Sequence, residues 1–264
     1  MVDLTQVEAV FAASLLGLII GSFISMLTWR LPRMLYLDAG STAHSITLSR
    51  SKCPHCQTTL SWHQLIPIFS WFFAKGKCLT CHTPISIRYP LIEIGTMLIT
   101  GFLIWHFGQT TSALFAVGFS WILITILVID IEHQLILDSL SLPLLWAGLL
   151  INSQAYYVSA EQAILGAAIG YMILWALFHS FKLLTGKEGM GYGDFKLLAA
   201  LGAWFGVMAI PQIILIASLS SLVIGGGLAL LRLKKLEDPI PFGPFLAIGG
   251  WSSLVLGNQL IQQL

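Results

Sequence analysis

Two aspartates lie beside long apolar stretches and could carry acid–base chemistry. Asp194 ends a stretch with glycine at every second position, residues 189–194, and Asp130 closes a separate apolar run, residues 121–129. An ionisable side chain next to membrane-length apolar sequence is costly and marks a functional site by default. Two carboxylates held close together cannot both ionise easily, so one keeps its proton. Such a pair could hydrolyse an amide bond, because the ionised carboxylate takes a proton from water while its protonated partner polarises the carbonyl.

Each of these aspartates also has a structural explanation. Asp194 could cap the start of a helix, where an acid is favourable. Asp130 could be a buried acid that pairs with a base such as Lys196 or Lys182. Lone intramembrane acids also serve transport as proton relays. The residues alone therefore leave a catalytic dyad, a structural role and a transport role open.

Other acids compete with Asp130 for the second catalytic position. Asp138 and Glu132 flank the same loop, and Asp138 lies two turns further on if the helix continues. Glu93 follows Arg88 at the start of another apolar run, which favours a structural ion pair or a substrate contact over acid–base chemistry.

The four cysteines form two CxxC pairs with 21 residues between them, Cys53 and Cys56 followed by Cys78 and Cys81. This spacing predicts a four-thiolate zinc site, in which each pair supplies two corners of a tetrahedron. A redox CxxC would not need a second copy, and a rubredoxin-like iron centre is the alternative metal. Since four thiolates complete the site, no histidine is assigned to it. An insert of this size has little core of its own, so the metal is predicted to be structural.

The elements that must position these residues are membrane helices. The chain of 264 residues is 56% hydrophobic and only 9% charged, whereas a soluble domain carries about 25% charged residues. The amino end does not resemble a cleavable signal, because acids precede its first apolar run. Eight apolar runs are predicted to span the membrane: 9–29, 91–107, 113–129, 140–151, 163–181, 197–210, 211–231 and 240–256. Two of them, 140–151 and 197–210, are short for a span.

The basic residues orient these spans. With eight spans and the amino terminus outside, all 13 Lys and Arg residues fall in inside segments, as the positive-inside rule requires. Asp130 and Asp194 then emerge on the same, cytoplasmic, side. The sequence therefore predicts an all-α polytopic membrane protein with a cytoplasmic zinc-binding insert between helices 1 and 2. Its parts are a first helix (1–29), the insert (30–90) and a second membrane domain (91–264).

Several long motifs resemble those of the type IV prepilin peptidases, the GxGD-type membrane aspartyl proteases that are also N-methyltransferases. The motifs are residues 21–23 (Gly-Ser-Phe), 29–32 (Trp-Arg-Leu-Pro), 51–56 (Ser-Lys-Cys-Pro-His-Cys), 85–90 (Ile-Ser-Ile-Arg-Tyr-Pro), Asp130, and 189–196 (Gly-Met-Gly-Tyr-Gly-Asp-Phe-Lys). They run nearly end to end. Two departures are Leu137 before Asp138, where the family has proline, and a shorter segment between Arg33 and Cys53.

The resemblance implies a bacterial inner-membrane enzyme that uses Asp130 and Asp194 to remove the short basic leader of type IV prepilins and type II secretion pseudopilins. It also implies methylation of the new amino terminus with S-adenosylmethionine. No glycine-rich strand–turn–helix unit marks a site for this cofactor, so no residues are assigned to it. Acids such as Asp38, Glu132 and Asp138 could attract the basic leader. The expected partners are these polypeptides and the lipid bilayer, with no nucleic acid.

Two other function classes stay open on the sequence. An ion-coupled transporter would use the intramembrane acids as proton relays and would need broken helices in repeated halves. A non-catalytic assembly factor would use the zinc insert to dock partners.

Overall fold

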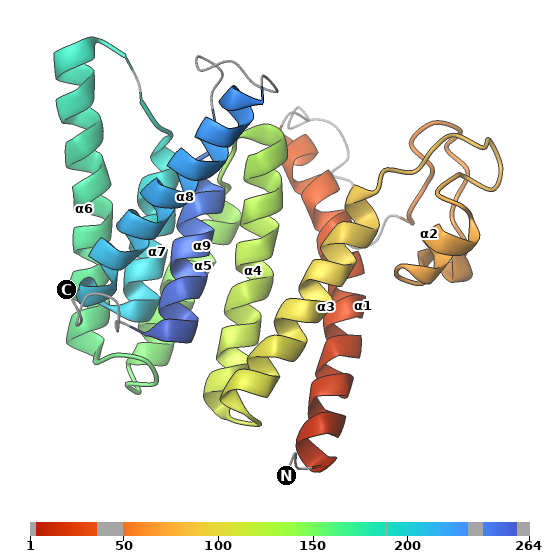
Figure 1. The fold of residues 1–264 in the computed structure, drawn as a ribbon, viewed down its shortest axis with the longest axis horizontal. Helices are drawn as coiled ribbons and strands as arrows, with labels where there is room; N and C mark the ends of the chain where they lie inside the picture. The colour runs from red at the N-terminus through yellow and green to blue at the C-terminus, as the bar shows by residue number, and fades with distance from the viewer. Residues whose placement is uncertain (1–3, 36–49, 188, 232–239, 258–264) are drawn as a thin grey trace. The chain divides into compact units, whose positions relative to one another are not determined.

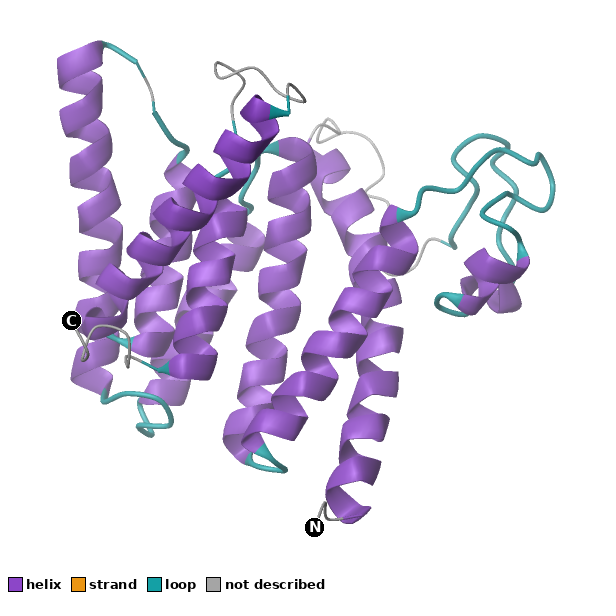
Figure 2. Cartoon of the chain, viewed as in Figure 1, coloured by secondary structure: helices purple, strands orange, loops and turns teal. Residues whose placement is uncertain are grey.

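The computed structural model describes residues 4–35, 50–187, 189–231 and 240–257, and in these ranges all regular structure except two isolated β-bridges is helical (Figures 1 and 2). The α-helices are α1 (Leu4–Leu35), α2 (Phe69–Phe73), α3 (Arg88–Phe107), α4 (Thr111–His133), α5 (Asp138–Asn152), α6 (Ala160–Thr185), α7 (Tyr192–Phe205), α8 (Ile210–Leu230) and α9 (Gly243–Leu256). Two 3₁₀ turns, η1 (Trp62–Leu65) and η2 (Val207–Ala209), accompany them. Asp3, an acid before the first apolar run, Asp38, and the basic residues Arg232, Lys234 and Lys235 entered the sequence predictions and lie outside the described residues.

Each of the eight predicted apolar runs corresponds to one helix, but their lengths differ from the prediction. Among the described residues, five segments are long and apolar enough to cross a membrane: Leu4–Met34, Arg88–Phe107, Thr111–His133, Ala160–Thr185 and Val207–Leu230. Helices α5, α7 and α9 have only 15, 14 and 14 residues. Such helices are about 21–23 Å long, against a hydrocarbon core of about 30 Å. The sequence analysis therefore identified α5 and α7 as short. It overestimated the length of α9, the third short helix.

The predicted end of the run 197–210 is wrong. The run 197–210 was expected to end at Ile210, but α7 ends at Phe205, after which Gly206 has φ of 78° and ψ of 175°. This backbone conformation is essentially restricted to glycine and cannot continue a helix. The 3₁₀ turn η2 and then α8 follow it.

The chain divides into two compact units, residues 1–125 and 126–264. In the first unit, α1 packs closely against α3. A Cβ at Gly17 would lie 2.6 Å from the Thr100 hydroxyl, and one at Gly21 would lie 2.8 Å from the Cα of Glu93. Small residues at a helix interface allow this close approach, which is typical of membrane helices.

In the second unit, α7 is the buried helix around which α5, α6 and α9 pack. Every residue from Leu197 to Phe205 is buried. The side-chain amide of Asn152 donates to the carbonyls of Ala203 and Trp204 at 2.8 and 2.9 Å, and thereby ties the end of α5 to the end of α7. Helix α6 is longer than α7, and its C-terminal end extends beyond the start of α7 (Figure 1). The N-terminal end of α7, with Asp194, is therefore recessed below the end of its neighbour.

Candidate active site and metal centre

Asp194 lies in the first turn of α7, where its carboxylate is bonded to the backbone. It is the third residue of the helix and only 6% exposed. Its Oδ2 atom accepts a hydrogen bond from the backbone N–H of Gly191, the residue that precedes the helix, at 3.2 Å. Gly191 is the N-cap of α7, and Asp194 is at the third helical position, so Asp194 supports the helix start without being its N-cap as the structural explanation had expected. The glycine-rich stretch leads into α7 and presents the carboxylate at its beginning.

Asp130 lies near the end of α4 and is bonded to the start of a different helix. It is 4% exposed, and its Oδ2 atom accepts a hydrogen bond from the backbone N–H of Gly243, the first residue of α9, at 3.0 Å. Helix α4 ends three residues later, and Gln134, with φ of 52°, turns the chain away. Both carboxylates therefore accept a hydrogen bond from a backbone N–H at the start of a helix, α7 for Asp194 and α9 for Asp130, where a negative charge is favoured.

The two carboxylates are brought together within the second unit. Asp130 is close enough for its charge to act on Asp194. Ile136, in the loop after α4, packs between the glycines beside them: a Cβ at Gly193 would lie 2.6 Å from its Cβ, and one at Gly243 would lie 3.0 Å from its Cδ1. The site is thus formed where α4 ends and where α7 and α9 begin.

The competing acid Asp138 has a different partner. Lys196 donates to both of its carboxylate oxygens, at 2.6 and 2.8 Å, and the side chain of Asp138 is 56% exposed. Lys196 therefore pairs with Asp138, at the start of α5, and not with Asp130 as the structural explanation of Asp130 had allowed. Glu132, the other competing acid, is also exposed.

The four cysteines form one cluster in the insert between α1 and α3. Their sulfur atoms all lie within 4.8 Å of one another, and the cluster could hold a metal ion. The Sγ atoms of Cys53 and Cys81 are 3.8 Å apart, and those of Cys56 and Cys78 are 4.0 Å apart. Zinc bound tetrahedrally at about 2.3 Å from each sulfur would separate them by about 3.8 Å. The donor set thus fits zinc in chemistry and in size.

The two CxxC pairs have the same backbone structure. In the first, Gln57 N–H donates to the Cys53 carbonyl at 2.9 Å; in the second, His82 N–H donates to the Cys78 carbonyl at 2.9 Å. Gln57 and His82 both have positive φ, at 58° and 56°. A hydrogen bond with the Thr83 hydroxyl, at 3.2 Å, lowers the pKa of Cys81 to about 5, which favours the thiolate that a metal requires.

Comparisons with known proteins cover nearly the whole chain. The bacterial peptidase A24 N-terminal domain matches residues 15–107, and the type IV leader peptidase family matches residues 116–226. A prepilin leader peptidase/N-methyltransferase of Stutzerimonas stutzeri is 45% identical over 267 residues, which cover 95% of this chain and 92% of that protein. The chain belongs to the type IV leader peptidase family. Proteins of the same name from Aeromonas hydrophila and Pseudomonas aeruginosa are each 42% identical, over 93% and 95% of this chain and 90% and 91% of theirs. No solved structure gives a significant match.

In this leader-peptidase chain, sequence reasoning missed the residue that binds Asp130. Gly243 is 113 positions away from Asp130, and nothing in the acid motifs pointed to it. The available signal was local: Gly243 lies between prolines 241 and 244 at the edge of the last apolar run. Because proline is favoured in the first turn of a helix, this pattern marks the start of α9.

Glu93 also has a contact that the sequence did not indicate. It is buried, and it accepts a hydrogen bond from the backbone N–H of Ile68 in the insert at 2.7 Å. Arg88, the expected ionic partner of Glu93, donates to the hydroxyl of Thr28 in α1 at 2.7 Å.

Proposed function

We propose that this chain is a membrane aspartyl endopeptidase that removes the short basic leader from type IV prepilins and type II secretion pseudopilins, and then N-methylates the new amino terminus. Membership of the type IV leader peptidase family and relatives that carry both activities in their name support this proposal. The observation that carries the peptidase part is the meeting of two buried carboxylates, Asp130 and Asp194.

The proposed reaction uses the two aspartates as a general acid and a general base. A shared proton leaves one carboxyl neutral, and the neutral carboxyl donates to the scissile carbonyl oxygen. The ionised carboxylate takes a proton from water as that water attacks the carbonyl carbon. Collapse of the tetrahedral intermediate breaks the C–N bond, and the leaving amine takes a proton from the dyad. The backbone bonds from Gly191 and Gly243 hold the carboxylates in place through these steps.

The glycines beside Asp194 suit a polypeptide substrate. Gly191 carries no side chain, and a Cβ there would meet nothing closer than 3.7 Å, so an extended peptide can approach the backbone next to the carboxylate. Gly193 instead makes room for Ile136. Of the acids expected to attract a basic leader, Glu132 and Asp138 are both exposed, and Asp138 is bonded to Lys196.

We also propose zinc at Cys53, Cys56, Cys78 and Cys81, where it would hold the insert together as a structural ion. S-adenosylmethionine is the methyl donor on family grounds alone, and no residue is assigned to it. The proposed parts of the chain remain 1–29, 30–90 and 91–264, with the insert as the methyltransferase part.

The proposed topology has eight spans in the bacterial inner membrane, with the amino terminus periplasmic and the insert cytoplasmic. The complete positive-inside bias of the sequence supports it. The short helices α5, α7 and α9 fit this topology if their ends face other helices or a polar cavity, where irregular backbone is tolerated at membrane depth.

In the direct test, the purified chain is incubated with a prepilin and with methyl-labelled S-adenosylmethionine, and the product is identified by mass spectrometry. We expect a product that lacks the leader and carries one methyl group. A variant with both aspartates replaced by alanine should release no leader. If the wild-type chain releases no leader but conducts or exchanges ions in vesicles, the transporter alternative replaces this proposal. If it does neither and only binds pilus proteins, the assembly-factor alternative replaces it.

A further inference from the structure

The insert exposes a group of large aromatic side chains that its own fold does not use. Trp62 in η1 and Phe69, Phe72 and Phe73 in α2 are 78%, 56%, 71% and 78% exposed. We call these four residues the aromatic face. Trp71, by contrast, is partly buried, and its Nε1 donates to the carbonyl of Ile85 at 3.1 Å. One aromatic residue of α2 therefore serves the interior of the insert, and three face outward.

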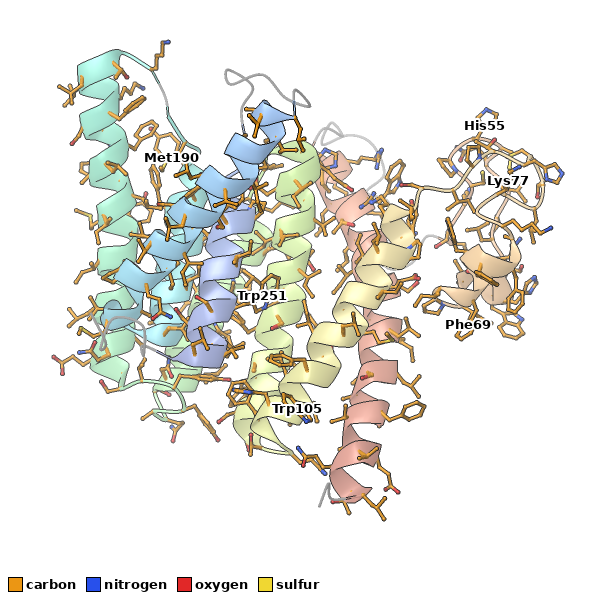
Figure 3. The ribbon with its side chains drawn as sticks, viewed as in Figure 1. His55, Phe69, Lys77, Trp105, Met190 and Trp251 are labelled. Carbon is orange, nitrogen blue, oxygen red and sulfur yellow. The ribbon has the colours of Figure 1, made fainter. Side chains whose placement is uncertain are left out.

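The aromatic face and the metal cluster lie at opposite ends of the insert. In Figure 3, Phe69 is at one end, and His55 and Lys77, which belong to the CxxC loops, are at the other. The CxxC end is mostly polar, with Lys52, Gln57 and Lys77 exposed, and Leu79 is an exposed apolar residue there. The insert is thus amphipathic along its length. A contiguous exposed apolar patch of this kind marks a site of interaction with a protein or a membrane.

The Glu93 contact fixes the position of the aromatic face relative to α3. Glu93 lies five residues after Arg88, or about 7.5 Å along the helix axis from its start. Its carboxylate, 6% exposed, accepts a hydrogen bond from the N–H of Ile68, the residue that immediately precedes α2. The start of α2 is therefore held level with the second turn of α3 and not beyond its end.

Ile68 lies in a tight turn just before α2. It has φ of 61° and ψ of −54°, a conformation that a β-branched residue rarely adopts. The N–H of Phe69 donates to the carbonyl of Pro67 at 2.6 Å, so Ile68 is the central residue of a γ-turn. This turn directs the N–H of Ile68 to the buried carboxylate of Glu93.

Helix α3 is long and apolar enough to cross a membrane, so its first turns lie at the membrane surface. Side chains held level with those turns meet the interface between lipid headgroups and acyl chains, where tryptophan and other aromatic residues are enriched. We propose that the aromatic face is an interfacial anchor that rests on the lipid bilayer, and that Glu93 is the positioning residue that sets its depth. The polar CxxC end then points into water.

The anchor can be tested by lipid photolabelling of the full-length chain. The chain is placed in nanodiscs of phosphatidylethanolamine and phosphatidylglycerol that contain a phospholipid with a diazirine on its acyl chain. After illumination, labelled residues are mapped by mass spectrometry. We expect label on residues 62–73 at a level comparable with Leu98, an exposed residue of α3, and none at Leu79, an exposed apolar residue between two of the cysteines. Label at Leu98 with none at 62–73 would overturn the proposal.

Variants of Glu93 test the positioning role separately. Glu93→Ala removes the acceptor for Ile68 and should lower label on residues 62–73 several-fold, while zinc content and label at Leu98 stay unchanged. Glu93→Gln keeps an acceptor oxygen and should restore the label. If labelling of residues 62–73 were unchanged in Glu93→Ala, Glu93 would not be the positioning residue. Crosslinks from the aromatic face to a second copy or to a prepilin, in place of lipid, would reject the bilayer as its partner. None of these measurements depends on peptidase or methyltransferase activity.

Discussion

Asp130 and Asp138 lie eight residues apart in one short stretch, yet their surroundings give them different chemistry. Asp130 is buried beside Asp194 and is bonded to a backbone amide. Asp138 is exposed and is held by the ammonium group of Lys196. An exposed ion pair contributes about 0–1 kcal/mol to stability. The ammonium group of Lys196 favours the ionised form of the Asp138 carboxylate, so this carboxylate does not share a proton with a second acid. Burial and partners therefore separate two residues that the sequence could rank only by resemblance.

At the residue scale, Gly243 gives a sharp prediction. A Cβ at this position would lie 2.5 Å from Oδ2 of Asp130, so Gly243→Ala should push the carboxylate out of place. We expect prepilin cleavage to fall on the order of 10²-fold, the usual effect of a small misplacement of a catalytic group. Cleavage rate in detergent, with folding checked by thermal unfolding, is the measurement.

Gly227→Ala in α8 is the matched control, since a Cβ there would meet nothing within 4 Å. It should cleave as wild type does and be slightly more stable, because alanine favours helix over glycine by roughly 1 kcal/mol. If both variants lost cleavage equally, any added methyl group in α8 or α9 would lower activity. That result would contradict the specific role assigned to Gly243.

At the scale of the elements, the insert depends on its metal because it has little core. Cys53→Ser should reduce zinc from about one ion per chain to almost none and make residues 50–87 sensitive to protease. Elemental analysis and limited proteolysis measure the two effects. If the insert carries the methyltransferase, methylation should fall further than cleavage. Iron in place of zinc, or a metal-free wild-type chain purified under reducing conditions, would refute the zinc assignment.

The sequence predicted elements better than it predicted the contacts between them. Apolar runs and CxxC spacing are local patterns, so they identified the eight helices of the apolar runs and the four clustered cysteines. The end of α7 was missed because Gly206 breaks the helix inside a continuous apolar run. The bonds from Gly243 to Asp130 and from Ile68 to Glu93 join residues 113 and 25 positions apart. Such backbone-to-side-chain contacts leave no periodic signal, and only folding brings them together.

At the scale of the whole molecule, the eight-span topology makes a prediction about two loops. In a background with the native thiols masked, a cysteine in place of Tyr156, between α5 and α6, should react with an impermeant reagent from the periplasm. A cysteine in place of Lys187, after α6, should react only from the cytoplasm. Labelling of intact cells and of inverted vesicles distinguishes the two sides. If both cysteines reacted from one side, α6 would not span, and the positive-inside argument would fail.

The central claim is that Asp130 and Asp194 act as one catalytic unit. The most direct measurement is prepilin cleavage by Asp130→Asn, Asp194→Asn, the double variant and Asp138→Asn, each checked for membrane insertion and zinc. Asparagine keeps the shape of the acid but cannot take up or share a proton. Each dyad variant should lose roughly 10²–10⁴-fold in rate, as expected for loss of a general acid or base. The double variant should be no worse than either single one, because the two groups act together.

Asp138→Asn should cleave at close to the wild-type rate, since it removes only an exposed ion pair. Cleavage that survives Asp130→Asn but is lost with Asp138→Asn would contradict the account by making Asp138 the partner of Asp194. Normal cleavage by all four variants would show that the chain is no aspartyl peptidase.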